Sequence, residues 1–109
     1  MYKGLYAYAW DLADEGLEAA LERIRPTGVN TITLAASYHA GKFLRPHGRT
    51  GKVYFPKDGT VYFRARSERY GQIKPLINPL VEDFDGFAEL ARTTPDLDRV
   101  ALVVCFIFL

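Results

Sequence analysis

The sequence contains one cysteine, Cys105, and no second thiol with which it could form an internal disulfide. We therefore expect no disulfide framework and no need for an oxidising compartment. The longest apolar run, from Val100 to Leu109, is half of the roughly 20 residues that a membrane-spanning helix needs. The first residues also lack the apolar core and cleavage site of a signal peptide. These absences predict a cytoplasmic protein without a membrane partner, in which Cys105 belongs to the core.

Histidine is equally scarce. His39 and His47 lie eight residues apart, and neither a cysteine pair nor an HExxH pattern accompanies them. This spacing matches no common metal site. We therefore expect no metal and no other cofactor.

The remaining composition is that of one folded domain. Apolar residues make up 49% of the 109 residues and charged residues 25%. The net charge of +1 hides an asymmetry, because residues 40–74 carry nine basic and two acidic side chains. The flanking segments, 1–39 and 75–109, have net charges of −2 and −4. A basic insert thus separates two acidic scaffold pieces, which bears on the partners of the protein and not on its fold.

The N-terminal third predicts a βαβ unit. Residues 4–10 (GLYAYAW) alternate without a charged side chain, which is typical of a strand covered on both faces. Residues 13–25 carry one apolar stripe at helical spacing and predict an amphipathic helix. Pro26 ends this helix, and Gly28 permits the turn into a second buried strand over residues 29–37. Two strands joined by a helix are expected to pair in parallel.

The insert predicts a hairpin and a loop. Residues 53–55 (Val-Tyr-Phe) and 61–63 (Val-Tyr-Phe) lie on either side of the four-residue loop Pro56-Lys57-Asp58-Gly59. This pattern predicts that the two aromatic runs pair as a β-hairpin. Residues 66–83 have no clear period and are expected to form a loop.

The C-terminal third predicts a helix and a strand. Residues 83–93 predict a short helix capped by Asp83 or Asp85, with Pro95 beyond its end. Residues 100–109 read as a third buried parallel strand. Because this strand has no following helix to cover it, we expect a truncated chain. An edge strand that pairs in a dimer is the alternative.

The sequence therefore predicts an α/β protein, an incomplete parallel (β/α)-barrel-type fragment in the order β-α-β, inserted hairpin, α-β. Residues 1–109 would form one partial barrel domain, with the basic, hairpin-containing insert at about 40–82. Long insertions that follow strands in such folds lie on the face where active sites are built. The insert thus marks the functional face.

Seven residues near the expected strand ends are candidates for substrate binding. They are Trp10, Asp11, Tyr38, His39, Lys42, Arg45 and His47. Trp10 could stack on a sugar ring or a base, or pack in the core. Asp11 could serve as a general acid/base or as a helix cap. His39 is a candidate for proton transfer, with a structural role as the alternative. The basic side chains, of which Arg45 lies in a turn held by Pro46, could grip an anion or simply face solvent.

These segments resemble a known family. The Trp10-Asp11 pair, the run Tyr38-His39-Ala40-Gly41-Lys42 and the turn Arg45-Pro46-His47 carry the resemblance, which spans about residues 5–104. The chain resembles the N-terminal part of uncharacterised bacterial (β/α)8-barrel proteins of glycoside-hydrolase-like families. The resemblance implies a hydrolase that acts on carbohydrate with two carboxylates. In such barrels the acids usually come from later strands, so the catalytic residues are unknown and this chain alone is expected to be inactive.

Other functions remain open on the sequence alone. The chain could be a small α/β binding module whose basic insert binds an anionic ligand or nucleic acid, although carbohydrate or another small molecule is the favoured partner. A sugar-isomerase-like barrel would need metal ligands beyond residue 109. Self-association through the exposed terminal strand is also expected.

Overall fold

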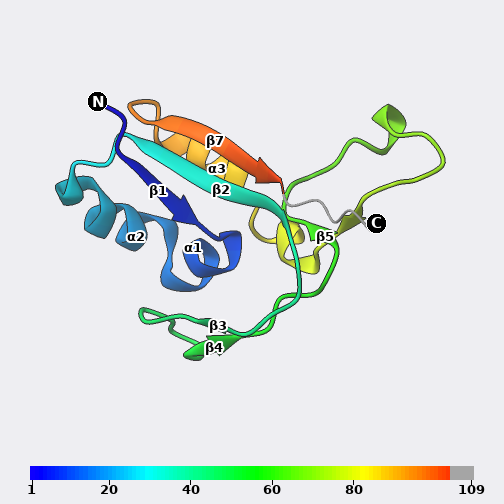
Figure 1. The fold of residues 1–109 in the computed structure, drawn as a ribbon, viewed down its shortest axis with the longest axis horizontal. Helices are drawn as coiled ribbons and strands as arrows, with labels where there is room; N and C mark the ends of the chain where they lie inside the picture. The colour runs from blue at the N-terminus through cyan, green and yellow to red at the C-terminus, as the bar shows by residue number, and fades with distance from the viewer. Residues whose placement is uncertain (104–109) are drawn as a thin grey trace.

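The computed structural model describes residues 1–103 (Figure 1). The scaffold elements are β1 (Gly4–Ala7), α1 (Ala9–Glu15), α2 (Leu17–Ile24), β2 (Thr31–Tyr38), α3 (Gly86–Thr93) and β7 (Asp98–Val103). The insert between β2 and α3 contributes four two-residue strands, β3 (Phe43–Leu44), β4 (Val53–Tyr54), β5 (Thr60–Val61) and β6 (Leu76–Ile77). Short 3₁₀ turns cover Arg25–Thr27, Ser67–Arg69 and Pro79–Glu82.

The central strand of the five-stranded sheet is β2. It pairs in parallel with β1, with Gly4 opposite Thr31, and in parallel with β7, with Asp98 opposite the same residue. Its last two residues pair antiparallel with β5, which in turn pairs with β6, while β3 and β4 form a separate two-stranded sheet. The α/β class, the mostly parallel sheet and the parallel β1–α–β2 unit are thereby confirmed. The described part is an open sheet.

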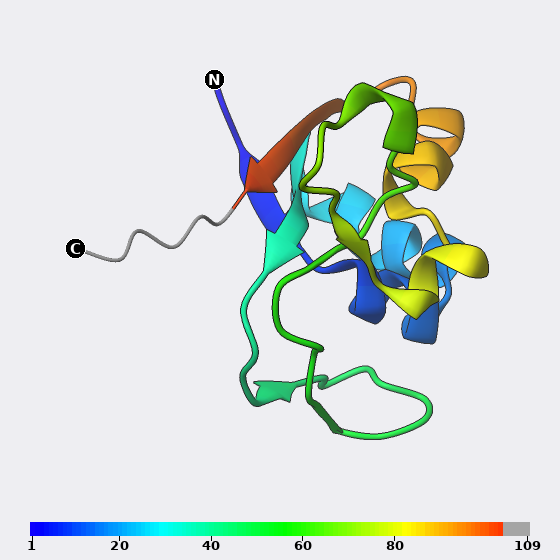
Figure 2. The same ribbon diagram turned by 90° about the vertical axis from the view of Figure 1, so that its right-hand side faces the viewer.

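The three helices all lie on one side of β1, β2 and β7 (Figure 2). Ile32 and Leu34 of β2 are each 1% exposed and belong to the main core cluster on that side. Their partners in the cluster are Leu12, Ala20, Leu21 and Leu90. On the other face of the strands, Tyr6 is 73% exposed and Val100 46% exposed. The prediction of two covered faces is therefore correct for β2 and wrong for β1 and for the described part of the terminal strand.

Gly16 divides the expected single helix over 13–25 into α1 and α2. Its φ of +87° is a conformation that glycine adopts readily and other residues avoid, so it ends α1 and begins α2. The helical region also begins earlier than expected, at Ala9. Tyr8 still has an extended backbone, and the strand-like alternation in the sequence therefore runs past the end of β1. Trp10 and Asp11 consequently lie in α1 and not at a strand end.

The predicted hairpin between residues 53–55 and 61–63 is wrong in its pairing. A hairpin does form, but it joins β4 to β3, and β5 pairs with β2. Since β2 extends beyond the ends of its ladder with β1, its last main-chain groups need other partners, and the Tyr62 N–H donates to the Ala36 carbonyl at 2.8 Å. The turn at Asp58-Gly59 is present, with Gly59 at a φ of +69°. The sequence thus located the turn and missed the partners of its flanking strands.

The helix ends follow the sequence closely. Pro26 lies in the 3₁₀ turn that closes α2, and Gly28 adopts a left-handed φ of +79° before β2. Asp85 caps α3 by accepting a hydrogen bond from the Ala88 N–H at 3.2 Å, which decides between the two predicted caps. Residues 104–109, including Cys105, lie outside the described part of the chain. Among residues 1–103, no helix has the length and apolar character required to cross a membrane.

The Asp85 cap provides a test of the fold. Replacing Asp85 by alanine leaves the Ala88 N–H without its partner, and we expect the free energy of unfolding to fall by about 1 kcal/mol. Urea denaturation would measure it. The matched control is Asp83→Ala, since Asp83 is exposed and lies before the helix, and it should change stability by less than about 0.5 kcal/mol. Equal losses in the two variants would contradict the cap assignment.

Candidate functional site

An aromatic cluster occupies the region beyond the carboxyl ends of β1 and β2. Its centre is Trp10, whose ring lies 4.4 Å from that of Tyr8 and 5.1 Å from that of Tyr54, both nearly parallel to it. The ring of Tyr62 meets Trp10 at a steep angle, with centroids 5.3 Å apart. Trp10 is only 2% exposed. In this chain it anchors α1 to the insert and presents no open face to a sugar.

Tyr38 enters the cluster from the end of β2. The Tyr8 hydroxyl donates a hydrogen bond to the Tyr38 hydroxyl at 3.0 Å, and the two rings meet edge to face. Burial and this hydrogen bond raise the pKa of Tyr8 to about 12. His39, the next residue, lies with its ring 4.4 Å from Tyr38 and its Nδ1 2.7 Å from the Ala40 carbonyl oxygen. The Tyr8 hydroxyl is therefore a neutral hydrogen-bonding group at physiological pH.

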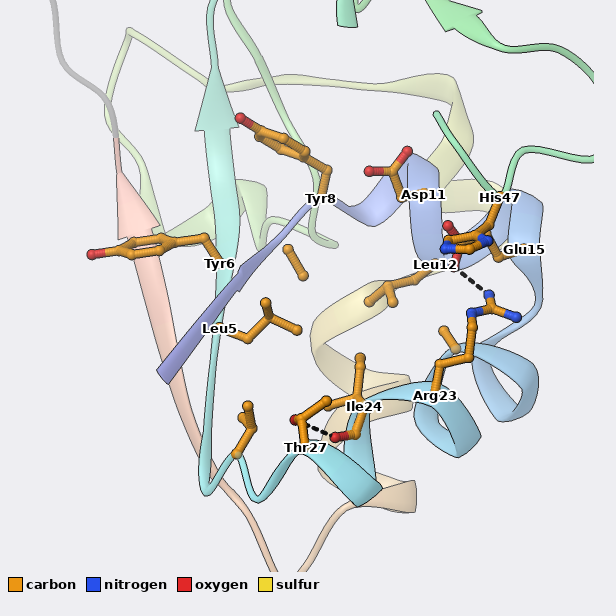
Figure 3. A pocket seen from close by; sticks show the side chains of 13 residues that line it. Leu5, Tyr6, Tyr8, Asp11, Leu12, Glu15, Arg23, Ile24, Thr27 and His47 are labelled. Atoms are coloured by element: carbon orange, nitrogen blue, oxygen red, sulfur yellow. Dashed lines mark hydrogen bonds and ion pairs between the residues drawn. The ribbon is translucent and has the colours of Figure 1, made fainter. Parts of the chain in front are cut away.

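A cavity of about 450 Å³ runs beside β1 (Figure 3). Its apolar wall comes from β1, α1, α2 and the loop before β2, and consists of Leu5, Ala7, Leu12, Ala20, Ile24 and Val29. The polar end, near the carboxyl end of β1, is lined by Tyr8, Asp11, Glu15, Arg23 and His47. Two of the residues that the sequence singled out, Asp11 and His47, therefore meet in one cavity although they are far apart along the chain.

Asp11 is half-buried in this cavity and does not cap a helix. The N-cap position of α1 belongs to Tyr8, and the Asp11 main-chain N–H donates to the Tyr8 carbonyl at 3.1 Å. Burial raises the pKa of Asp11 from 3.8 to about 6; the nearby Glu15 carboxylate adds to the increase and Arg45 opposes it. Within the described residues, its buried Oδ1 has no hydrogen-bond partner. A carboxyl group with such a pKa can give or take a proton near neutral pH, as a general acid or base must.

Glu15 is a second carboxylate at this site, which the sequence reasoning missed. It lies four residues after Asp11 on α1, a spacing that puts both side chains on one face of a helix. Its side chain is 14% exposed, and its Oε2 lies 2.7 Å from an Arg23 guanidinium nitrogen. The spacing was visible in the sequence, but the helix was expected to begin only at residue 13. The Asp11–Glu15 relationship was therefore not recognised.

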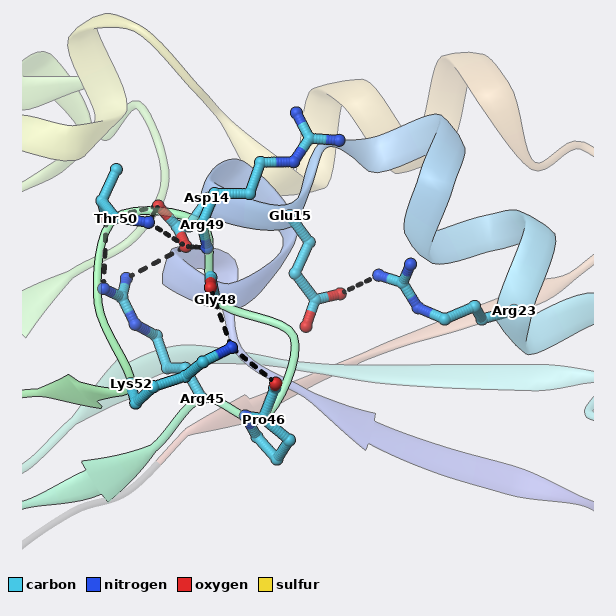
Figure 4. A network of polar contacts seen from close by, with 9 residues as sticks. All are labelled: Asp14, Glu15, Arg23, Arg45, Pro46, Gly48, Arg49, Thr50 and Lys52. Carbon is cyan, nitrogen blue, oxygen red and sulfur yellow. Dashed lines mark hydrogen bonds and ion pairs between the residues drawn. The ribbon is translucent and has the colours of Figure 1, made fainter.

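Asp14 of α1 binds the insert through hydrogen bonds to the loop between β3 and β4 (Figure 4). Its carboxylate accepts hydrogen bonds from the Arg49 N–H at 2.6 Å and from the Thr50 hydroxyl at 2.5 Å. Arg45 lies 3.8 Å from the same carboxylate and donates to the Thr50 hydroxyl oxygen at 3.2 Å. These hydrogen bonds, with Thr50 first, lower the pKa of Asp14 below its usual value. The network orders the loop between β3 and β4, which carries His47 into the cavity beside β1.

The contacts of Arg45 are with other side chains of the protein, so its role in this structure is to hold the insert in place. Its side chain is 8% exposed, its charge faces Asp14, and its guanidinium lies 5.0 Å from the centre of the Tyr54 ring. Arg45 and Trp10 line a second cavity of about 440 Å³, together with Ala13 and Asp14 of α1. Lys42 is exposed in the segment between β2 and β3. The seven predicted site residues thus fall into three environments: the cavity beside β1, the aromatic and Asp14 contacts, and open surface.

Within residues 1–103, no three His, Cys, Asp or Glu side chains gather closely enough to hold a metal ion. The fold and the site together define an α/β protein with a mostly parallel open sheet and a carboxyl-lined cavity at the carboxyl end of β1. No protein-family model, curated protein or solved structure matches the chain.

The raised pKa of Asp11 predicts a pH dependence of stability. Because the folded state favours the protonated carboxyl, its stabilising contribution is complete below about pH 4 and is lost as the pH rises through 6. Asp11→Asn removes the ionisation, so we expect the variant to exceed the wild type by about 1 kcal/mol at pH 7, a gain limited by the partial exposure of the side chain. The two proteins should be equally stable near pH 4.

Urea denaturation across this pH range would measure the effect. Glu18→Gln on the exposed surface of α2 is the matched control and should follow the wild type at every pH. A difference between wild type and Asp11→Asn that is the same at pH 4 and pH 7 would contradict the raised pKa of Asp11.

Proposed function

We propose that this chain forms the N-terminal portion of a glycoside-hydrolase-like (β/α)-barrel protein that acts on carbohydrate in the cytoplasm. The observation that carries the proposal is the half-burial of Asp11, whose pKa is raised to about 6 at the polar end of the cavity beside β1, near the carboxyl end of that strand. Chemistry in parallel α/β barrels takes place at that end of the strands.

The layering supports this proposal. Three parallel strands with all helices on one face are the repeating arrangement from which such barrels are built. The face of β2 turned away from the helices carries small side chains, among them Thr31, Thr33 and Ala35, which are each less than 7% exposed. The long insert follows β2 and leaves the sheet at the end where a barrel carries its active site.

The chemistry of the site supports it as well. Glycosidic bond cleavage requires a carboxylic acid that protonates the leaving oxygen and an ionised carboxylate that assists from another side. Asp11 has the pKa of the first kind of group. Glu15 is held by Arg23, and Tyr8, which lines the same cavity, offers a neutral hydroxyl for a hydrogen bond to a sugar. His47 lies at the same polar end of the cavity.

We propose further that the chain binds sugar weakly and has no hydrolytic activity by itself. The cavity is bounded by β1, α1, α2 and the insert. Among the described residues, no further strand pairs with the outer edge of β1 to close the cavity on that side. A site with one wall buries too little of a sugar to position two carboxylates around its glycosidic bond. Additional β/α units would supply the opposite wall and the remaining acid.

Sugar binding can be measured by titrating labelled protein with a panel of mono- and oligosaccharides while following amide chemical shifts. We expect shifts centred on Asp11 and His47, with dissociation constants of about 1 mM or weaker. Asp11→Asn and His47→Ala should weaken binding several-fold, whereas Glu18→Gln on the exposed surface of α2 should not. No release of chromophore from aryl glycosides is expected. Either an absence of shifts at both residues for every sugar, or hydrolysis by the chain alone, would contradict the proposal.

A second candidate, an anion-binding module, is favoured by the loop between β5 and β6. This loop extends away from the sheet and carries the exposed residues Arg64, Arg66, Arg69, Tyr70 and Lys74 (Figure 1). If three of these cations contacted phosphates of a single-stranded oligonucleotide, affinity would fall about 20-fold between 50 and 200 mM salt. An oligonucleotide that binds with this salt dependence, together with a failure of every sugar, would replace the carbohydrate proposal by this one.

A further inference from the structure

His47 reaches the candidate site from a loop and has no polar partner that would fix its ring. It lines the polar end of the cavity beside β1, and every other described residue that lines this cavity lies in the chain before β2 (Figure 3). The side chain is exposed, and within residues 1–103 it forms no hydrogen bond, ion pair or ring contact. The main chain of the loop between β3 and β4 therefore determines where the His47 imidazole lies.

The ammonium of Lys52 holds this main chain on both sides of His47 (Figure 4). Its Nζ donates to the Pro46 carbonyl at 3.0 Å and to the Gly48 carbonyl at 3.3 Å. These two residues come directly before and after His47. A lysine ammonium has three N–H donors, so one cation can bind both carbonyls at once. The two hydrogen bonds restrict the main-chain torsions on either side of His47.

The rest of the loop is also closed tightly. The Arg45 N–H donates to the Lys52 carbonyl at 2.8 Å, and the Gly48 N–H donates to the Arg45 carbonyl at 2.9 Å. A Cβ atom on Gly48 would lie 2.2 Å from the Gly51 carbonyl oxygen, so the loop leaves no room there for a side chain. With Asp14 bound to the other half of the loop, the loop has a defined conformation before any ligand is present.

We infer that Lys52 is a positioning residue of the carbohydrate site, whose ammonium fixes the loop so that the His47 ring is already in place when a sugar arrives. Binding a ligand requires the side chains that contact it to be ordered, and a loop that is ordered in advance reduces the unfavourable entropy of that step. Among the described residues that line the cavity beside β1, Lys52 is absent, so it acts on the sugar through His47. The inference rests on the proposed function, because it concerns the same site.

The first test needs no sugar. Backbone amide relaxation, measured by NMR, gives the order parameter of the His47 N–H, which we expect to be about 0.85 in the wild type and below about 0.6 in Lys52→Met. Lys52→Arg should restore the order, because a guanidinium can also donate to two carbonyls. Lys57→Met is the matched control, since Lys57 is exposed in the turn before β5, and it should resemble the wild type.

The same variants separate a positioning role from a structural one. Lys52 is exposed, so Lys52→Met should leave the midpoint of urea unfolding unchanged. Gly48→Ala disturbs the same turn by steric conflict and should also lower the order parameter of His47. Gly71→Ala is its control, because nothing lies within 4 Å of a Cβ atom added at Gly71.

The second test repeats the titration with mono- and oligosaccharides. We expect Lys52→Met to weaken sugar binding roughly fivefold, as expected when one side chain must be ordered on binding. The shifts at Asp11 should persist while those at His47 diminish. In a His47→Ala background, Lys52→Met should weaken binding no further, because its effect passes through the missing imidazole.

The two tests distinguish failure of the inference from failure of the proposed function. An unchanged order parameter of His47 in Lys52→Met would overturn the inference. So would equal sugar affinity of Lys52→Met and the wild type, or an equal loss with and without His47, and in both cases the sugar site itself would stand. If no sugar binds the wild type, the proposed function is wrong and Lys52 has no part in a carbohydrate site, whatever the order parameter shows.

Discussion

The ladder that β2 forms with its neighbours is the constraint on which the rest of the structure depends. β1 and β7 pair with it in parallel, and β5 pairs with its last two residues. On the helix side, Ile32 and Leu34 contribute to a core with side chains from α1, α2 and α3. Because β2 holds both outer strands, it sets the position of every helix and the point where the insert leaves the sheet.

The site arises from the way in which the insert returns to α1. Asp14 binds the main chain of the loop between β3 and β4, while Tyr54 and Tyr62 pack against Trp10. Together these contacts cover one side of α1. The carboxyl of Asp11 is half-buried close to Glu15, and both conditions favour its protonated form. The insert contributes His47 to the cavity in which this carboxyl lies.

The outer edge of β1 and the Asp11 cavity lie next to each other. The cavity that carries Asp11 runs along the outer edge of β1, where the described sheet has no further strand. Anything that pairs with β1 would also form a wall of that cavity. Completion of the sheet and completion of the pocket are therefore linked physically.

Local signals in the sequence predicted the parallel β1–α–β2 unit. The pairing of the short strands in the insert depends on non-local contacts, and the sequence analysis predicted it wrongly. The apolar stripe on the helix, Pro26, Gly28 and the Asp85 cap act within a few residues, and the structure confirms each of them. The hairpin prediction used the matched aromatic runs and the Asp-Gly turn, but β2 competes for the strand at Thr60–Val61 and its position cannot be read from local pattern.

The site shows the same division. The proximity of Asp11 and His47 depends on a loop that Asp14 holds across 35 residues of sequence, and no spacing along the chain reveals that contact. The break at Gly16, like the Asp11–Glu15 spacing, is a local feature that the sequence offered and that was overlooked. An isolated glycine inside a helical pattern is usually tolerated, and only its left-handed φ shows that the helix ends there.

The most direct test of the account is the reactivity of two tyrosines in dilute, monomeric protein. Tyr6 is 73% exposed on the face of the sheet that lacks helices, and Tyr62 is 0% exposed beside Trp10. Tyrosine nitration, followed by peptide mass spectrometry, compares them within one chain. The account predicts rapid modification of Tyr6 and none of Tyr62 until the protein unfolds. Similar rates at the two residues would contradict the one-sided arrangement of helices around β2.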